Sequence, residues 1–297
     1  MTKHVIIFLK GLAMGAADVV PGVSGGTIAF ITGIYNDLLA AINAFNINTF
    51  NVLRKQGVRA AWKEVNGSFL LALGSGIVVS ALSLAIVFKK LMATSPHFLW
   101  AFFFGLVLGS IVLVGKMIIK FDAKIITALV IGTAVSFALT VLEPGSGTAS
   151  PLYIFIAGAI AICAMILPGI SGAFILLLLG VYPLLLDAVH DRDFKFIGIL
   201  GAGFVVGLLS FSRFLKWLLD NYFQVTLAVL LGFLVGSLNK IWPWKSPFIV
   251  EGHEIQHNIL PSTHEHPQIA AILGLVVLGF VVIVLLSKFA PKIDETK

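Results

Sequence analysis

Two apolar stretches of this chain are interrupted by nearly the same motif. "PGVSGGTIAFITGIY" occupies Pro21–Tyr35 and "PGISGAFILLLLGVY" occupies Pro168–Tyr182, 147 residues further on. Proline removes a backbone donor and disfavours helix at the residue before it, and the glycines loosen the backbone further. We therefore predict that neither stretch is one continuous helix. Each should fold as two helical arms around a break made by Pro21 and Gly22 in the first copy, and by Pro168 and Gly169 in the second.

The apolar surroundings of both motifs indicate a membrane protein. Hydrophobic residues make up 59% of the chain and charged residues 11%, whereas soluble domains average about 25% charged. With 297 residues, the chain can supply several transmembrane helices of about 20 residues each. The formal charge of +6 belongs to loops that set orientation, so we expect no nucleic-acid partner. Cys163 is the single cysteine and cannot form an internal disulfide.

The similarity between the two copies continues downstream of the motif. Three further pairs align in order: "LGSGIVVSALS" (Leu73–Ser83) with "LGAGFVVGLLS" (Leu200–Ser210), "GLVLGSI" (Gly105–Ile111) with "GFLVGSL" (Gly232–Leu238), and "LVIG" (Leu129–Gly132) with "VVLG" (Val276–Gly279). The offsets of 127, 127 and 147 residues predict an insertion in the first half after the motif. They also predict a compensating insertion near residues 246–265.

The repeats define the expected fold. We predict an all-α polytopic membrane protein that forms a single membrane domain, with a first repeat over residues 1–145 and a second over 146–297. Each repeat should contain a re-entrant or broken helical hairpin, at 5–42 and 152–189, and three transmembrane helices. The six expected spans are 67–88, 97–115, 124–142, 197–215, 222–239 and 269–287.

The parity of these elements predicts that the two halves are inverted. A hairpin crosses the membrane either zero times or twice, so the three remaining spans give each half an odd number of crossings. With the N-terminus inside, 14 of the 20 lysines and arginines fall on inner segments. The outer ones are Lys89, Lys90, Arg192, Lys195, Lys240 and Lys245. The positive-inside rule therefore predicts that both termini are cytoplasmic.

A helix that begins just after each break offers an anion site. Its first backbone N–H groups have no partner within the helix, and its dipole favours negative charge. Ser24 and Ser171 are positioned to act as N-caps or as ligand donors. Inverted repeats with discontinuous helices are the architecture of secondary transporters. The alternative is that Pro-Gly and serine serve only as kink and packing residues within membrane helices.

Two charged side chains within the apolar segments are further candidates. Asp18 could carry a coupling proton or sodium ion, or it could simply cap a helix end; its repeat partner is Met165. Arg213 is the best side-chain partner for phosphate, because a guanidinium binds phosphate through two parallel hydrogen bonds. The alternative for Arg213 and the neighbouring Lys216 is that both extend to the cytoplasmic interface.

Enzyme and metal signatures are weak. The chain has neither a Walker A loop nor an HExxH motif, so we expect a protein that is not an enzyme and needs no cofactor. The histidines of the loop at 253–266 fit no strong zinc pattern, so we predict no metal site and leave the role of this loop open. Trp242 and Trp244 are typical of an outer aromatic belt.

The segments "GLAMGAADVVPGVSGGTIAFITGIY" (Gly11–Tyr35), "LPGISGAFILLLLGVY" (Leu167–Tyr182) and "GSLNKIWPW" (Gly236–Trp244) closely resemble a bacterial and archaeal membrane family once catalogued as domain of unknown function 368. The resemblance covers nearly the whole chain. That family is regarded as polyprenyl-phosphate transporters, thought to return undecaprenyl phosphate, the lipid carrier of cell-wall synthesis, from the outer to the inner leaflet. The motif positions that correspond are Asp18, Pro21, Gly22, Ser24, Gly25, Gly26, Thr27, Pro168, Gly169, Ser171 and Gly172.

The resemblance implies a transporter of polyprenyl phosphate in the bacterial cytoplasmic membrane, with this lipid and membrane lipids as its partners. The expected phosphate-binding residues are Ser24, Gly25, Gly26, Thr27, Ser171, Gly172 and Arg213. Ala173 and Phe174 replace the second glycine and the threonine of the first motif, so the second site is less polar. A proton or sodium gradient would drive the cycle through Asp18. A small-anion channel or transporter that uses the broken-helix sites, and a lipid-phosphate enzyme, are the alternatives; the sequence does not define the oligomeric state.

Overall fold

The computed structural model describes residues 3–19, 24–250, 253–264 and 267–288. Helices dominate this part of the chain, and the two strands that it contains form a single hairpin. Several helices are long and apolar enough to cross a membrane. The prediction of an all-α polytopic membrane protein is therefore confirmed.

Helices of the first half begin where a side chain or a glycine allows the backbone to turn. Asn46 caps one helix by accepting hydrogen bonds from two backbone N–H groups, and Asp122 caps another by accepting one from the N–H of Ile125 at 2.9 Å. The elements are α1 (Lys3–Val19), α2 (Gly25–Ile31), α3 (Tyr35–Asn43), α4 (Ile47–Gln56), α5 (Val58–Glu64), α6 (Gly67–Thr94), α7 (Pro96–Gly115) and α8 (Ala123–Val141).

The second half has the same order of helices, apart from the two segments discussed below. Its elements are α9 (Pro151–Ile166), α10 (Gly172–Leu178), α11 (Val181–His190), α12 (Phe194–Asn221), α13 (Phe223–Ser237), β1 (Lys245–Val250), β2 (His253–Asn258), the 3₁₀ turn η1 (Pro261–Thr263) and α14 (Ile269–Ser287). The two strands pair antiparallel, with Lys245 opposite Asn258. Asp193 caps α12 through the backbone N–H groups of Lys195 and Phe196.

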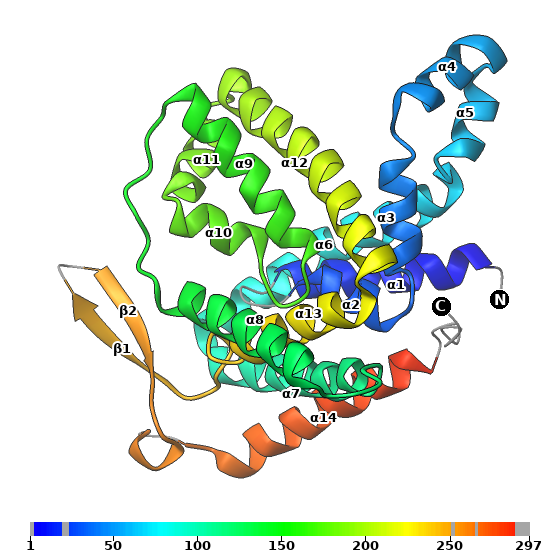
Figure 1. Ribbon diagram of the computed structural model, residues 1–297. Coiled ribbons are helices and arrows are strands. Elements are labelled where there is room, and N and C mark those ends of the chain that lie inside the picture. Colours follow the sequence, from blue (N-terminus) through cyan, green and yellow to red (C-terminus); the bar gives the residue numbers. More distant parts are fainter. Residues whose placement is uncertain (1–2, 20–23, 251–252, 265–266, 289–297) are drawn as a thin grey trace.

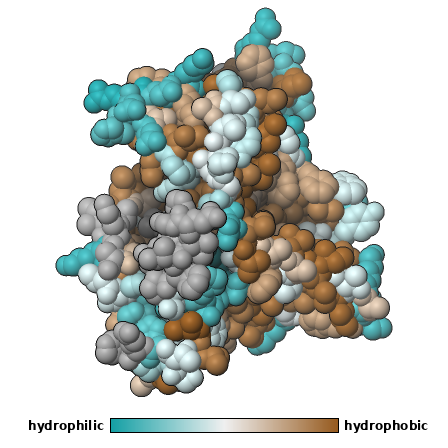
Figure 2. Space-filling view, turned by 90° about the vertical axis from the view of Figure 1, so that its left-hand side faces the viewer, coloured by the Kyte–Doolittle hydropathy of each residue, from teal (hydrophilic) through white to brown (hydrophobic). Residues whose placement is uncertain are grey.

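Five helices meet the length and apolarity needed to span a membrane: α6, α7, α8, α12 and α14. They coincide with five of the six expected spans, although α6 and α12 each continue to 28 residues. The sixth expected span, 222–239, corresponds to α13, which is apolar but only 15 residues long. Much of the surface of these helices consists of exposed large hydrophobic side chains, such as Leu82, Val130 and Val277. Figure 2 shows the resulting broad hydrophobic areas, which suit contact with lipid.

Helix pairing follows one pattern in both halves. α1 packs along α6 in the first half, as α9 packs along α12 in the second. The remaining spans exchange partners between the halves, because α7 packs on α14 and α8 packs on α13 (Figure 1). Glycines permit these close approaches: a Cβ on Gly232 would collide with the backbone of α8, and one on Gly279 with the backbone of α7.

Both insertions expected from the repeat offsets correspond to distinct elements. The first contains α4 and α5, which follow the first hairpin, and the second contains the β1–β2 hairpin. Figure 1 shows them on opposite sides of the molecule, with the β-hairpin on the left and with α4 and α5 on the right, the side on which α1 begins and α14 ends.

The returning arm of each motif hairpin has a second bend that the sequence prediction missed. α2 and α3 meet at 113°, and α10 and α11 meet at 104°. Gly33 and Gly180 lie at these bends with positive φ angles of 72° and 64°, a conformation that favours glycine. Both glycines belong to the repeated motif and precede a repeated tyrosine by two residues, which was the available signal.

Candidate functional site

The second break is described in full. α9 ends at Ile166, Leu167 adopts an extended conformation as expected before proline, and Gly169 has a φ of +83°. A side chain at Gly169 would also meet the carbonyl oxygen of Phe233 at 2.8 Å. Ser171 is the N-cap of α10, although its Oγ lies 3.5 Å from the backbone nitrogen of Phe174. This capping bond is therefore weak.

The first break lies partly outside the described residues, which exclude Pro21 and Gly22. The description resumes at Ser24, the N-cap of α2, whose Oγ accepts a hydrogen bond from the backbone N–H of Gly26 at 3.1 Å. Ser24 is fully buried, as are Gly25, Gly26 and Thr27 at the start of α2.

The two motifs contact each other inside the protein. The N–H of Gly169 donates to Thr27 Oγ1 at 3.1 Å. Ser24 Oγ donates to the carbonyl of Met165 at 3.1 Å. The hydroxyl of Tyr35 donates to the carbonyl of Ile166, also at 3.1 Å. These three bonds join the first returning arm to the end of α9 and to the second break.

Charges from α1 occupy both ends of α2. At the N-terminus, Asp18 Oδ1 accepts a hydrogen bond from the N–H of Gly25 at 2.7 Å. At the C-terminus, Lys10 Nζ donates to the carbonyl of Thr32 at 2.6 Å, and Lys10 is buried. A carboxylate at the positive end of the helix dipole and an ammonium at its negative end both stabilise the helix.

Lys10 is the functional candidate that sequence reasoning missed. It was counted among the inner loop charges, although it stands within an apolar run and should have been treated as an intramembrane cation. In the repeat alignment Lys10 corresponds to Ala157 and Asp18 to Met165. The charge pair is therefore particular to the first hairpin, and the two hairpins differ in their electrostatics.

A small recess lies beside the second break. It is lined by Ser136, Leu139, Thr140, Gly169, Ile170, Ser171, Phe174, Ser237 and Lys240. Its hydroxyl groups come from α8, α10 and α13, which contribute Thr140, Ser171 and Ser237 among others. The ammonium of Lys240 stands 4.3 Å from the centre of the Phe174 ring. Of these residues the sequence had singled out only Gly169 and Ser171 for the site.

Arg213 lies away from the motif contacts. Its side chain is exposed on α12, and its guanidinium donates to the carbonyl of Phe45, beyond the end of α3, at 3.3 Å. The neighbouring Lys216 forms an exposed ion pair with Asp220 at 3.0 Å. Neither of these contacts involves a residue of the two motifs, and the position of both side chains at the cytoplasmic interface stays a prediction.

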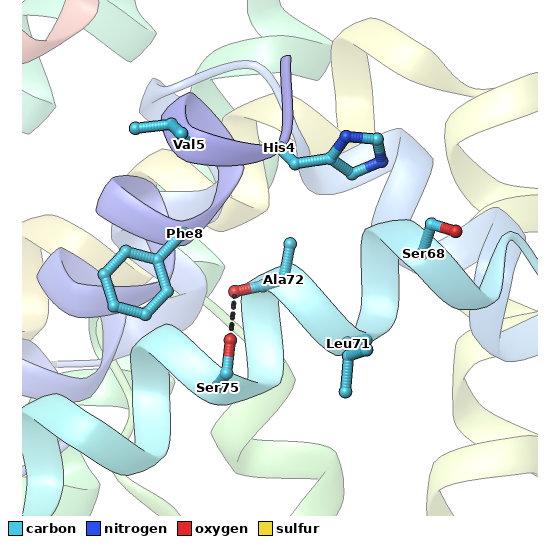
Figure 3. Close-up of a pocket in the computed structure, with 7 residues that line it drawn as sticks. All are labelled: His4, Val5, Phe8, Ser68, Leu71, Ala72 and Ser75. Atoms are coloured by element: carbon cyan, nitrogen blue, oxygen red, sulfur yellow. Dashed lines mark hydrogen bonds between the residues drawn. The ribbon is translucent and has the colours of Figure 1, made fainter. Parts of the chain in front are cut away.

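A wider groove on the surface belongs to a different part of the molecule. Figure 3 shows the residues that line it, with His4, Val5 and Phe8 on α1 and Ser68, Leu71, Ala72 and Ser75 on α6. Ser75 in this groove donates to its own helix, at the carbonyl of Ala72. The lining is mainly apolar, which suits hydrocarbon chains better than a phosphate group.

Trp244 corrects the expectation of an outer aromatic belt. It is buried, and its Nε1 donates to the carbonyl of Pro267 at 2.8 Å. Trp242 donates to the carbonyl of Ile259 at 2.9 Å. Trp244 also packs against Ala101 of α7 and Ile272 of α14, and the ring of Trp242 lies against that of Phe104, so both residues attach this segment to the helices. Across the described ranges, no three histidine, cysteine or acidic side chains gather as a metal site would require.

Comparison with known proteins identifies a matching family model and two similar transporters. The model of a family described as undecaprenyl phosphate translocase-like matches residues 14–259. A polyprenyl-phosphate transporter from Vibrio cholerae serotype O1 is 47% identical over 243 residues, which is 82% of this chain and 79% of the relative. A polyprenyl-phosphate transporter from Staphylococcus aureus is 33% identical over 257 residues, covering 80% of this chain and 86% of the relative. No solved structure matches significantly.

Proposed function

The chain belongs to the undecaprenyl phosphate translocase-like family, and from this premise we propose that it transports polyprenyl phosphate across a membrane. The structural observation that carries the proposal is the contact between the two broken helices, through the bond from Gly169 to Thr27. Breaks of this kind are tolerated inside membranes where they are buried in protein or line a cavity. In secondary transporters such breaks mark the substrate site.

The two halves, residues 1–145 and 146–297, are proposed to be inverted repeats. The exchanged pairing of α7 with α14 and of α8 with α13 supports this, because a two-fold relation converts one pair into the other. The separation of α4 and α5 from the β-hairpin supports opposite exposure of the two insertions (Figure 1). Without the buried Lys10, the inner segments still hold 13 lysines and arginines against six outside, so cytoplasmic termini remain the preferred orientation.

The proposed cycle takes the head group from the outer to the inner leaflet of the bacterial cytoplasmic membrane. The phosphate first meets Ser171 and Gly172 at the second break. It then reaches the end of α2, at Ser24, Gly25, Gly26 and Thr27, which is occupied by protein groups in this conformation. Opening of the contact between the hairpins would free Ser24 and Thr27. Arg213, exposed near the opposite end of the path, would receive the phosphate on the inner side.

Ion coupling is proposed to act through Asp18. Its hydrogen bond to Gly25 holds a negative charge at the place where the phosphate would bind, and two anions cannot share that helix end. A proton or a sodium ion that neutralises Asp18 would therefore admit the phosphate. This mechanism gives the gradient a direct effect on substrate binding.

The proposal can be tested with purified protein in liposomes that carry labelled undecaprenyl phosphate in one leaflet. Leaflet exchange is measured beside release of inorganic phosphate and beside chloride flux. We expect exchange without phosphate release and without chloride flux. Phosphate release would favour a lipid-phosphate enzyme, and rapid chloride flux without lipid exchange would favour an anion channel.

A further inference from the structure

Lys240 has no counter-charge among the residues that the structure describes. It follows α13, its side chain is half-buried, and its ammonium rests on the ring of Phe174. Among the described residues, it forms no ion pair and no side-chain hydrogen bond, and its ammonium has only the ring contact. Half-buried charges are costly unless paired, so this position suits an anionic partner from outside the chain.

A second lysine reinforces the positive charge. Lys245 at the start of β1 donates to Asn258 Oδ1 at 2.8 Å and lies 5.3 Å from the ring centre of Trp100. Burial, with a further contribution from the charge of Lys240, lowers the pKa of Lys245 to about 8. The two ammonium groups are thus close enough to disfavour each other when the site is empty.

Hydrogen bonds connect this lysine pair to the recess. Asn258 donates to Asn239 at 2.8 Å, and Asn239 donates to Thr140 Oγ1 at 2.7 Å. Thr140 and Lys240 both line the recess beside Ser171. The Oγ atom of Ser171 accepts a weak capping hydrogen bond. Its O–H group can therefore still donate a hydrogen bond to a ligand. The recess has a volume of only about 10 Å³ and Ser171 is buried, so a phosphate would rest at its mouth. There one phosphate oxygen would accept from the ammonium of Lys240 and another would point toward the hydroxyl of Ser171.

The surroundings favour a phosphate that carries an apolar tail. α8 supplies three lining residues of the recess, and it turns exposed hydrophobic side chains outward, including Val130, Val135 and Phe137. A hydrocarbon chain attached to the phosphate could lie along this face within the lipid. The β-hairpin lies at the end of the molecule opposite the start of α1 (Figure 1).

We propose that Lys240, Lys245 and Ser171 form a docking site for the phosphate monoester head group of a prenyl lipid at the β-hairpin end of the protein. This inference rests on the proposed function and assigns it a first binding site, which the lipid occupies before the hairpins separate. It places the main cationic contact at Lys240, whereas the sequence alone had pointed to Arg213.

Binding to the full-length protein in detergent tests this site. Farnesyl phosphate is the probe, with farnesol and inorganic phosphate as the comparisons that separate head group from tail. We expect Lys240→Met to weaken farnesyl phosphate binding by about tenfold or more, because a charged hydrogen bond is removed. Lys240→Arg should stay near wild type. Lys195→Ala, at an exposed lysine on the same predicted side, is the matched control.

Three results would overturn the inference. One is a folded Lys240→Met protein that binds farnesyl phosphate as wild type does. Another is inorganic phosphate binding as tightly as farnesyl phosphate, which would assign the site to free phosphate. The third is failure of wild type to bind farnesyl phosphate at all. If Lys240→Met does not fold, Lys245→Met takes its place with the same expectation.

Leaflet exchange separates this inference from the proposed function. Wild-type exchange that is unchanged in folded Lys240→Met protein would reject the docking site and leave transport intact. Binding that depends on Lys240 in a protein without any leaflet exchange would reject transport and leave the docking site intact.

Discussion

Asp18 accepts a hydrogen bond from the backbone N–H of Gly25 at 2.7 Å, so a carboxylate of the chain itself closes the N-terminus of α2. Lys10 closes the other end of the same helix through the carbonyl of Thr32. This short helix is therefore held at both ends by α1 within the first hairpin. A movement that separates the two hairpins has to break the bonds of Ser24, Thr27 and Tyr35 to the second hairpin instead.

Replacement of Asp18 by asparagine tests its role in coupling. Asn keeps an oxygen that can accept from Gly25 but removes the charge, so the dependence of transport on a proton or sodium gradient should flatten. Asp187→Asn, at an exposed acidic residue of the second hairpin, is the matched control and should keep the dependence. The measurement is the exchange rate in liposomes with and without each gradient; a fully retained gradient response in Asp18→Asn would place coupling elsewhere.

Gly26→Ala tests the contact between the hairpins. A Cβ at this position would collide with the carbonyl of Ile166, so the variant should lose about 1–3 kcal/mol of stability or hold the hairpins apart. Gly201→Ala is the control, because a Cβ there meets nothing within 4 Å and alanine favours the helix by up to about 1 kcal/mol. Thermal unfolding of both variants in the same detergent decides. If Gly26→Ala melted at the same temperature as Gly201→Ala, the close approach of Gly26 to Ile166 would not contribute to stability.

The two motif serines should differ in their effects. Ser24 caps α2 and also bonds the carbonyl of Met165, so Ser24→Ala should lower stability by about 1 kcal/mol. Ser171 makes only the long capping contact to Phe174, so Ser171→Ala should leave stability nearly unchanged and weaken phosphate binding instead. The measurements are thermal unfolding and farnesyl phosphate titration of both variants. A loss of stability in Ser171→Ala with unchanged phosphate binding would contradict these roles.

Phosphate binding at the lysine pair should depend on pH. Lys245 is charged below its pKa of about 8, and a phosphate monoester is already mostly dianionic above about pH 7. Affinity for farnesyl phosphate should therefore be highest near pH 7 and should fall as the pH rises through 8 and Lys245 loses its proton. Lys245→Arg should flatten this fall, because a guanidinium stays charged; an identical pH profile in that variant would exclude Lys245.

Much of the fold was predictable because membrane helices and breaks leave local signals. The apolar runs defined the spans, the repeat offsets located both insertions, and the two Pro-Gly-x-Ser-Gly motifs located the breaks. The pairing of α7 with α14 and of α8 with α13 was not predictable. Glycines along a helix indicate that another helix can approach closely, but they do not indicate which helix does so.

The site was less predictable than the fold, since it depends on which groups meet across long sequence separations. Ser24, Thr27 and Gly169 were identified by the motif, yet their mutual bonds place them in a closed contact. Lys240 lies within the family-like segment Gly236–Trp244, but the sequence analysis treated it only as an outer loop charge. Its position over the ring of Phe174 could not be read from the sequence. Arg213 had the right chemistry for phosphate but lies at the surface beside Phe45.

The most direct test of the central claim is the rate at which labelled undecaprenyl phosphate changes leaflet in liposomes that contain the purified protein. The account predicts a rate well above that of empty liposomes, together with a clear reduction in the Lys240→Met variant and none in Lys195→Ala. A rate equal to that of empty liposomes under every proton and sodium gradient would contradict it.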